Sequence, residues 1–254
     1  MKARRLQAQA HWLLLAVILA LWQTVCGLFD VSEFLFPSPS RIAAAFWEHH
    51  TVILLHAWRT YWVTMLGFAF SIVVGVLLGC LMGSSRLAYS SMYPLMTAFN
   101  ALPKAAFVPI LVVWFGIGVG PAVLTAFLIS FFPIMVNIAT GLATLEPELE
   151  DVLRVLGAKR RDVLWKVGLP RAMPYFFGAL KVSITLAFVG TTVSEMTASN
   201  EGIGYLLISA GSTMQMGLAF AGLLIVGAMA MAMYEFFARL ERRLTGWAHR
   251  GSEP

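Results

Sequence analysis

Several polar side chains lie inside apolar runs of this sequence, where they could contact a polar solute. They are Asn100, Lys104, Asn137, Ser183, Thr191, Ser194 and Glu195. A charged side chain in hydrocarbon is costly, about 2.5–3.5 kcal/mol for a lysine on insertion scales, so such groups mark a path for a polar solute. Ser183, Thr191 and Ser194 recur at roughly helical spacing, which predicts one hydrated helix face.

The run that holds Lys104 is interrupted by Pro94, Pro103 and Pro109. Proline removes backbone hydrogen bonds, and non-helical backbone at membrane depth is tolerated only inside protein or beside water. We therefore expect a broken helix here. Two interpretations of Lys104 stay open, because it can line a pathway or extend to the cytoplasmic face. Lys181 is expected to reach the interface or to form an ion pair.

Motifs of enzymes are missing from the sequence. It contains no Gly-x4-Gly-Lys-Ser/Thr phosphate loop, no nucleophile elbow and no zinc helix motif. His49, His50 and His56 have no acid or cysteine at ligand spacing, which favours interfacial histidines over a metal site. Cys26 and Cys80 lie in apolar runs. We expect no catalytic residue, no metal and no cofactor on this chain, so energy for any active process must come from a partner.

Composition identifies an integral membrane protein. The chain is 59% hydrophobic and 12% charged, whereas about 25% of a soluble domain is charged. Apolar runs close to spanning length occupy residues 12–28, 61–83, 93–118, 122–142, 174–195 and 218–237. They predict an all-α membrane protein with six transmembrane helices. A cleaved signal peptide is the alternative for 12–28, but no small-x-small cleavage site follows it.

Basic residues cluster beside alternate ends of these runs. The positive-inside rule then places residues 1–11, 144–170 and 241–254 in the cytoplasm and residues 29–60 outside, with a five-helix core over 61–240. The formal net charge of +5 therefore reflects membrane topology, and we expect lipid rather than nucleic acid as a partner.

Two segments on the expected outer side have features of their own. Ser40 is a candidate cap for an amphipathic helix over 41–50 that would lie on the outer face. The glycines of 200–204 predict either a tight re-entrant turn in an outer gate or an ordinary surface loop.

Small residues repeat every four positions in the second run. They are Gly67, Ser71, Gly75, Gly79 and Gly83. In lipid such a stripe lets another backbone approach closely. Tight packing within the subunit is favoured over a subunit interface.

Residues 144–170 form the one long polar interruption. Pro147 suits a first helical turn, with Glu146 and Glu148 beside the positive end of the helix dipole. Leu149, Val152, Leu153 and Leu156 share one apolar stripe, and Gly157 ends the helix. A short amphipathic helix outside the membrane is suited to docking.

The same loop resembles a known signature. Asp151-Val152-Leu153, Gly157, Val167 and Leu169-Pro170 are similar to the cytoplasmic loop of bacterial ABC importer permeases. That loop reads Glu-Ala-Ala, three residues, Gly, nine residues, Ile, one residue, Leu-Pro. The spacing is intact, while Asp stands for Glu and Val-Leu for Ala-Ala. Trp114-Phe115-Gly116, Phe132-Pro133 and Glu195-Met196 resemble the nitrate, sulfonate and taurine subgroup.

The resemblance implies a type I permease fold in the inner membrane of a bacterium. A second copy of the chain, two cytoplasmic ATPase subunits that bind ATP and Mg, and an extracytoplasmic solute-binding protein would be its partners. The residues implied to dock on the ATPase are Asp151, Leu153, Arg154, Val155, Leu156, Gly157, Leu169 and Pro170. The loop between spans four and five would contain the coupling helix.

The substrate implied by the resemblance is an aliphatic sulfonate, taurine, nitrate or a similar small anion. A pyrimidine or vitamin precursor is an alternative within the same importer type. An ATP-independent secondary transporter or channel would also explain broken helices and intramembrane charges, but it leaves the loop signature without a role.

Overall fold

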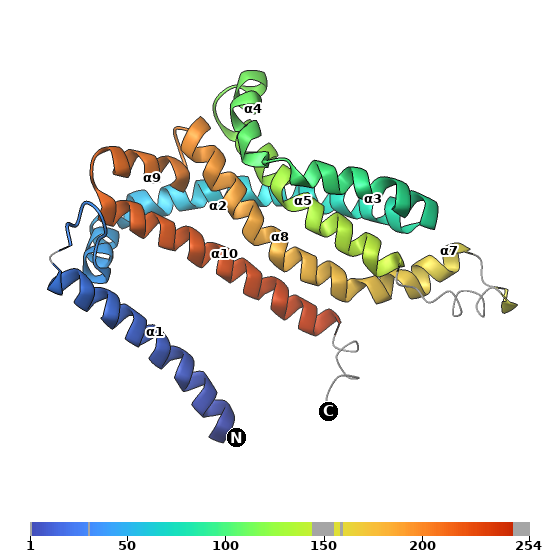
Figure 1. The fold of residues 1–254 in the computed structure, drawn as a ribbon, viewed down its shortest axis with the longest axis horizontal. Coiled ribbons are helices and arrows are strands. Elements are labelled where there is room, and N and C mark those ends of the chain that lie inside the picture. The colour runs from blue at the N-terminus through green and yellow to red at the C-terminus, as the bar shows by residue number, and fades with distance from the viewer. Residues whose placement is uncertain (1, 30, 144–154, 158–159, 246–254) are drawn as a thin grey trace.

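The computed structural model describes residues 2–29, 31–143, 155–157 and 160–245 (Figure 1). Within these ranges every regular element is a helix, as predicted. In chain order they are α1 (Lys2–Leu28), α2 (Pro39–Gly83), α3 (Arg86–Ala101), η1 (Lys104–Phe107), α4 (Val108–Phe115), α5 (Val119–Ala143), α7 (Arg160–Val163), η2 (Leu164–Gly168), α8 (Leu169–Ala198), α9 (Ile203–Ser212) and α10 (Met216–Leu244).

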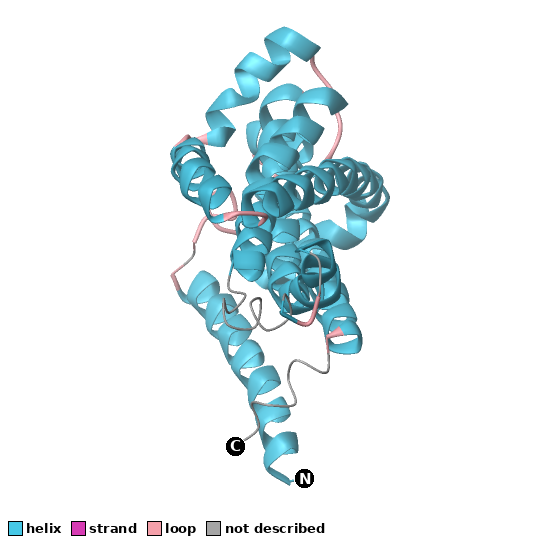
Figure 2. Cartoon of the chain, turned by 90° about the vertical axis from the view of Figure 1, so that its right-hand side faces the viewer, coloured by secondary structure: helices cyan, strands magenta, loops and turns pink. Residues whose placement is uncertain are grey.

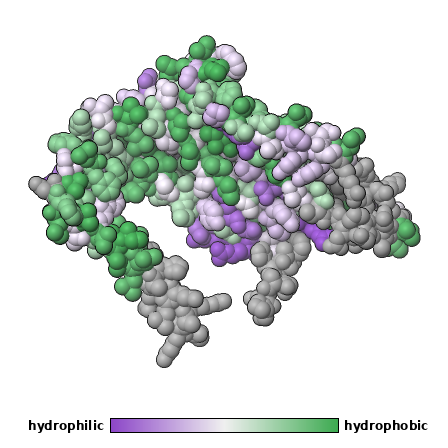
Figure 3. Space-filling model, in the orientation of Figure 1, coloured by the Kyte–Doolittle hydropathy of each residue, from purple (hydrophilic) through white to green (hydrophobic). Residues whose placement is uncertain are grey.

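In the part of the chain that the structure describes, four helices are long and apolar enough to cross a membrane. Their spanning segments are Pro39–Gly83, Val119–Ala143, Lys166–Ala198 and Met216–Leu244. A bent pair, Leu87–Ala101 with Lys104–Phe115, makes a fifth, and Leu13–Leu28 is a shorter apolar helix. Each of the six expected segments is therefore helical. In Figure 3 hydrophobic residues cover most of the visible surface, and hydrophilic ones gather along its lower edge.

Helix α1 leaves the bundle in both ribbon views (Figures 1 and 2). Its attachment lies near its C-terminal end, where the Trp22 ring packs on Phe36 with centroids 5.0 Å apart. The Ser40 amide donates to Gln23 Oε1 at 3.1 Å. Leu13, Leu14 and Leu21 are exposed. The apolar surface of α1 thus faces away from the rest of the chain.

Helix α2 begins earlier than expected. The sequence predicts a span from residue 61, but the helix starts at Pro39 and continues for 45 residues through a kink at His49. The part before the kink corresponds to the amphipathic helix predicted for 41–50. The prediction that Ser40 caps it is wrong, because the N-cap is Ser38 and Ser38 makes no side-chain capping bond.

The core is formed by α2, α5 and α8. A Cβ on Gly79 would lie 2.7 Å from the Met135 carbonyl oxygen of α5, and one on Gly75 would lie 2.9 Å from Ile134 Cβ. Ser71 Oγ and Ser130 Oγ are 2.6 Å apart across the same contact. The small-residue stripe packs within the subunit, as favoured from the sequence.

The broken helix predicted around Lys104 is confirmed. Helices α3 and α4 meet at a bend of 72°, and the break falls at Leu102 and Pro103 between α3 and η1. The Pro103 ring cannot donate a backbone bond, which explains why the α-helix stops there. After α4 the chain turns through Gly116 and Gly118, both at positive φ.

At its C-terminal end α8 turns directly into α9. The Gly118 amide donates to the Ala198 carbonyl oxygen at 2.8 Å, which ties the α4–α5 turn to this end of α8. Helix α9 then folds back, and its Ile203 and Leu206 are buried among the long helices. We call this the α9 end of the bundle and the opposite end, where α7 and η2 lead into α8, the α7 end.

Candidate functional site

A buried carboxylate organises the α9 end. Glu195, near the C-terminus of α8, is 2% exposed. The Thr60 hydroxyl of α2 lies 3.0 Å from its Oε1 and 2.8 Å from its Oε2. The Gly204 amide, in the first turn of α9, donates to Oε2 at 3.0 Å. One acidic side chain therefore joins three helices.

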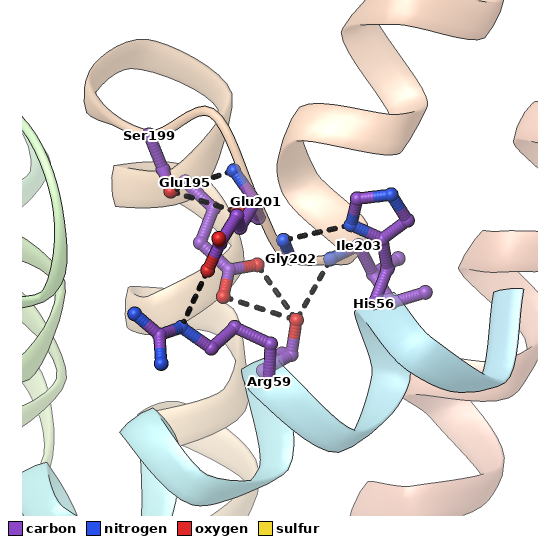
Figure 4. A network of polar contacts seen from close by, with 8 residues as sticks. His56, Arg59, Glu195, Ser199, Glu201, Gly202 and Ile203 are labelled. Carbon is purple, nitrogen blue, oxygen red and sulfur yellow. Dashed lines mark hydrogen bonds and ion pairs between the residues drawn. The ribbon is translucent and has the colours of Figure 1, made fainter. Parts of the chain in front are cut away.

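Thr60 has a second role in this network (Figure 4). Its Oγ1 accepts a hydrogen bond from the Ile203 amide at 2.8 Å, while its proton is available to Glu195. Free amides at a helix N-terminus need acceptors, and negative charge is stabilised there. Thr60 and Glu195 together supply both acceptors for the first amides of α9.

The turn before α9 is held by side chains of α2. The Gly202 amide donates to His56 Nδ1 at 3.0 Å, so this nitrogen carries no proton. Arg59 Nε lies 3.0 Å from Glu201 Oε2. Ser199 Oγ donates to the Glu201 carbonyl oxygen at 2.7 Å and accepts from its amide. The turn is therefore ordered by its own bonds and by two residues of α2.

Glycine is required at two positions of this turn. Gly202 has φ +96°, and a Cβ there would lie within 2.4 Å of the Glu195 carboxyl atoms. A Cβ on Gly204 would lie 2.3 Å from the Thr192 carbonyl oxygen. These two glycines allow the chain to reverse directly over Glu195, so the turn is tight, and its re-entry into the membrane stays a prediction. Its role in an outer gate stays a prediction.

A pocket of about 360 Å³ opens beside the network. Its walls come from the α4–α5 turn, the start of α5, α2, and the α8–α9 turn. Its lining residues are Arg59, Val63, Ile117, Gly118, Val119, Ala122, Glu195, Ser199, Asn200 and Glu201. We call it the Arg59–Glu195 pocket. It brings the end of the broken span next to the buried carboxylate.

Three other predicted pathway residues of α8 are buried between helices. Thr191 Oγ1 accepts from Thr64 Oγ1 at 2.9 Å. Ser183 Oγ and Ser194 Oγ are buried and have no hydrogen-bond partner among the described residues. All three side chains are 0% exposed within this chain. A solute would reach them only if the helices moved apart, and their place on a pathway stays a prediction.

Lys104 and Asn100 lie together at the break in the third span. Lys104 Nζ donates to Asn100 Oδ1 at 2.7 Å and to the Asn100 carbonyl oxygen at 2.8 Å. The lysine is partly exposed, and its charge is stabilised by the carbonyl and side-chain oxygens of Asn100. Asn137 in α5 donates to the Pro133 carbonyl oxygen at 2.8 Å. The structure does not bring these residues to the Arg59–Glu195 pocket.

Lys181 pairs with Glu241. The two side chains join α8 to α10 through an ion pair and are 20% and 12% exposed. This confirms the expectation that Lys181 forms an ion pair.

The predicted docking loop lies partly beyond what the structure describes. Asp151, Leu153 and Arg154 are outside the described residues. Val155 and Leu156 are 88% and 77% exposed, and Gly157 has φ +87°. Leu169 and Pro170 begin α8 directly after the π-helical turn η2. The last residues of the signature thus form the start of α8, the helix that carries Glu195 near its other end.

Sequence reasoning did not find Thr60, Arg59, His56 or Glu201. Arg59 and Thr60 come directly before the run predicted to start at 61, so they were treated as part of an outer segment. Their partners are far away in sequence, 135 positions for Thr60 and Glu195. No group of three or more metal-ligating side chains occurs among the described residues.

Comparisons with known proteins agree with this architecture. Residues 71–246 match the family described as "Binding-protein-dependent transport system inner membrane component". The putative aliphatic sulfonates transport permease protein SsuC of Bacillus subtilis is 31% identical over 92% of this chain and 86% of its own. The taurine transport system permease protein TauC of Escherichia coli is 27% identical, over 92% and 87%.

Two further similarities extend this set. The formylaminopyrimidine transport permease protein ThiX of Halalkalibacterium halodurans is 28% identical over 96% of this chain and 98% of its own. An inward-facing structure of the MetNI methionine ABC transporter has a chain that matches with a TM-score of 0.63, at 18% identity, over 78% of this chain and 98% of that chain. At 18% identity this match shows that the two chains share a fold. The chain belongs to the family of binding-protein-dependent transport system inner membrane components and is the permease of an ABC importer.

Proposed function

We propose that this permease translocates a small sulfonate, taurine, nitrate or a similar small anion that a solute-binding protein delivers. The printed names of two relatives, for aliphatic sulfonates and for taurine, support this substrate class. The formylaminopyrimidine permease has a similar percentage of identical residues, so a pyrimidine precursor is the second candidate substrate. Membership of the ABC importer permease family argues against the alternative of an ATP-independent transporter or channel.

The observation that carries the mechanism is the continuity of α8. This helix has 30 residues, so it extends about 45 Å at 1.5 Å per residue. It starts with Leu169 and Pro170 beside the docking loop and ends three residues after Glu195. Displacement of the loop is therefore transmitted to the Arg59–Glu195 pocket through one helix.

The partners and orientation belong to the same proposal. Val155 and Leu156 expose apolar side chains at the α7 end, which suits them to a groove of an ATPase. ATP and Mg would bind that partner, and closure of two ATPases would move two copies of this permease. Both termini and the docking loop would be cytoplasmic, and the α9 end would face the solute-binding protein. Alternating access would follow from two helix packings biased by ATP.

The test is biochemical reconstitution. The permease is purified together with the ATPase encoded beside it and placed in lipid nanodiscs. ATP hydrolysis is measured with the cognate binding protein, empty or loaded with taurine, ethanesulfonate, nitrate or an aminopyrimidine. We expect one of the sulfonate or nitrate ligands to stimulate hydrolysis. Stimulation only by the aminopyrimidine would select the second candidate, and failure to form a complex would contradict the proposal.

A further inference from the structure

We propose that the Arg59–Glu195 pocket is a subsite for a small zwitterion that carries an amino group and an anionic group, such as 2-aminoethanesulfonate. This inference rests on the proposed importer function and narrows its substrate class. It assigns the amino group and the anionic group of the solute to different polar residues of the pocket, and it excludes simple anions such as nitrate as the preferred occupant.

The size and walls of the pocket suit a small solute. Its volume is about 360 Å³, at the lower end of the range for ligand sites. One side is backbone and apolar, with Ile117, Gly118 and Ala122, and the other carries the polar groups. The apolar residues come from the turn after the broken span and from the start of α5.

Glu195 supplies acceptors for an amino group. A carboxylate has about four lone-pair positions. Oε2 receives the Gly204 amide, and the single Thr60 proton is shared between the two oxygens. The carboxylate of Glu195, one of the lining residues of the pocket, therefore keeps lone pairs that these bonds do not use. Glu201 adds a second carboxylate at the rim, 62% exposed.

Arg59 and Asn200 supply donors for the anionic group. Among the described residues, Arg59 forms its ion pair through Nε, which leaves the two terminal nitrogens of the guanidinium for a ligand. A guanidinium binds planar or branched oxyanions through two parallel N–H groups. Asn200, in the α8–α9 turn, also lines the pocket, and its side-chain amide can add a further donor.

The charge balance decides the class of ligand. The lining of the pocket contains two carboxyl groups, those of Glu195 and Glu201, and one guanidinium, that of Arg59. A simple anion entering this pocket would meet no excess of positive charge, and its approach would be opposed by the carboxylates. A zwitterion can pair with both kinds of charged group, with its ammonium toward Glu195 and its sulfonate or carboxylate toward Arg59.

The experiment measures protection of a cysteine in the pocket wall. Cys26 and Cys80 are replaced by serine, and Ile117→Cys is introduced into the permease in its complex with the ATPase in nanodiscs. The rate of modification by N-ethylmaleimide is measured with increasing taurine, ethanesulfonate or nitrate. Ethanesulfonate is the matched probe, because it lacks only the amino group. Phe34→Cys, outside this pocket, is the control position.

For each solute we determine the concentration that halves the modification rate of Ile117→Cys. We expect this concentration to be at least about tenfold lower for taurine than for ethanesulfonate or nitrate. The loss of one hydrogen bond to a charged group has an effect of this size. Arg59→Gln should raise that concentration at least about tenfold. Arg41→Gln, which breaks the exposed Arg41–Glu33 pair at 2.8 Å outside this pocket, should not change it.

Equal protection by ethanesulfonate, or no protection by any of the three solutes, would overturn the subsite. The importer function is read from the same samples by complex formation and by ATP-driven uptake with the binding protein. A complex that transports solute but shows no protection refutes only the subsite. A chain that never forms a complex refutes the function itself.

Discussion

The Thr60 hydroxyl on α2 lies 2.8 Å from the Glu195 carboxylate on α8, and it also accepts a hydrogen bond from the Ile203 amide of α9. A single hydroxyl group thus links three helices at the α9 end. Because both partners are buried, removing it would leave a carboxylate and an amide with fewer bonds.

Thr60→Val should destabilise the permease by about 1–3 kcal/mol, the cost of leaving buried polar groups without a partner. Thermal unfolding in detergent checks this, with Thr60→Ser as the variant that keeps the hydroxyl. Thr197→Val removes an exposed hydroxyl that bonds only within α8 and should have little effect. Equal stability of Thr60→Val and wild type would contradict the network.

Gly79→Ala should weaken the contact between α2 and α5. The added methyl would lie 2.7 Å from the Met135 carbonyl oxygen and 2.8 Å from Ile138 Cβ, so two backbones must separate. Overpacking of this kind costs about 1–3 kcal/mol. Gly227→Ala in α10 is the matched control, since no described residue lies within 4 Å of its added Cβ. Loss of folded protein on mild heating should distinguish the two variants.

The Lys181–Glu241 pair should show strong coupling. Lys181→Met leaves a largely buried carboxylate without its partner, which costs about 3–5 kcal/mol. The double variant Lys181→Met with Glu241→Leu should recover most of that loss, because apolar replacements of a buried pair are close to neutral. A double-mutant cycle on unfolding measures this. The exposed pair of Lys166 and Asp162, with side chains 78% and 45% exposed, should give a small coupling.

Gly157→Trp should uncouple ATP hydrolysis from transport. Gly157 has φ +87°, which side-chain-bearing residues rarely adopt, so the substitution strains the end of the docking helix. Nothing lies within 4 Å of an added Cβ among the described residues, so the change affects the docking surface rather than the core. We expect normal membrane insertion, weaker binding to the ATPase and loss of uptake. Gly211→Trp, whose added Cβ also has no neighbour within 4 Å in the described part of the chain, is a control at the α9 end. Normal uptake by Gly157→Trp would contradict docking at this loop.

Several features of the fold could be predicted from the sequence, because they depend on residues that are close together in the chain. Hydropathy showed the apolar segments because each is close to spanning length, and Pro103 marked the break in the third one since it cannot continue a helix. The spacing of Gly75 and Gly79 predicted a close helix contact, which α5 provides. The start of α2 was misplaced, because Arg41, His56 and Arg59 lower the hydropathy of a segment that stays helical.

Only the tertiary structure decided which polar groups meet. Thr60 and Glu195 are 135 positions apart, and Lys181 and Glu241 are 60 apart, so no local pattern relates them. Glu195 was recognisable as a costly residue in an apolar run, but its use depends on how α9 folds back over it. Pairing between distant helices follows from their packing, and packing is a property of the whole chain. The sequence by itself therefore determined a helical membrane permease, while the folded chain determined the Arg59–Glu195 pocket.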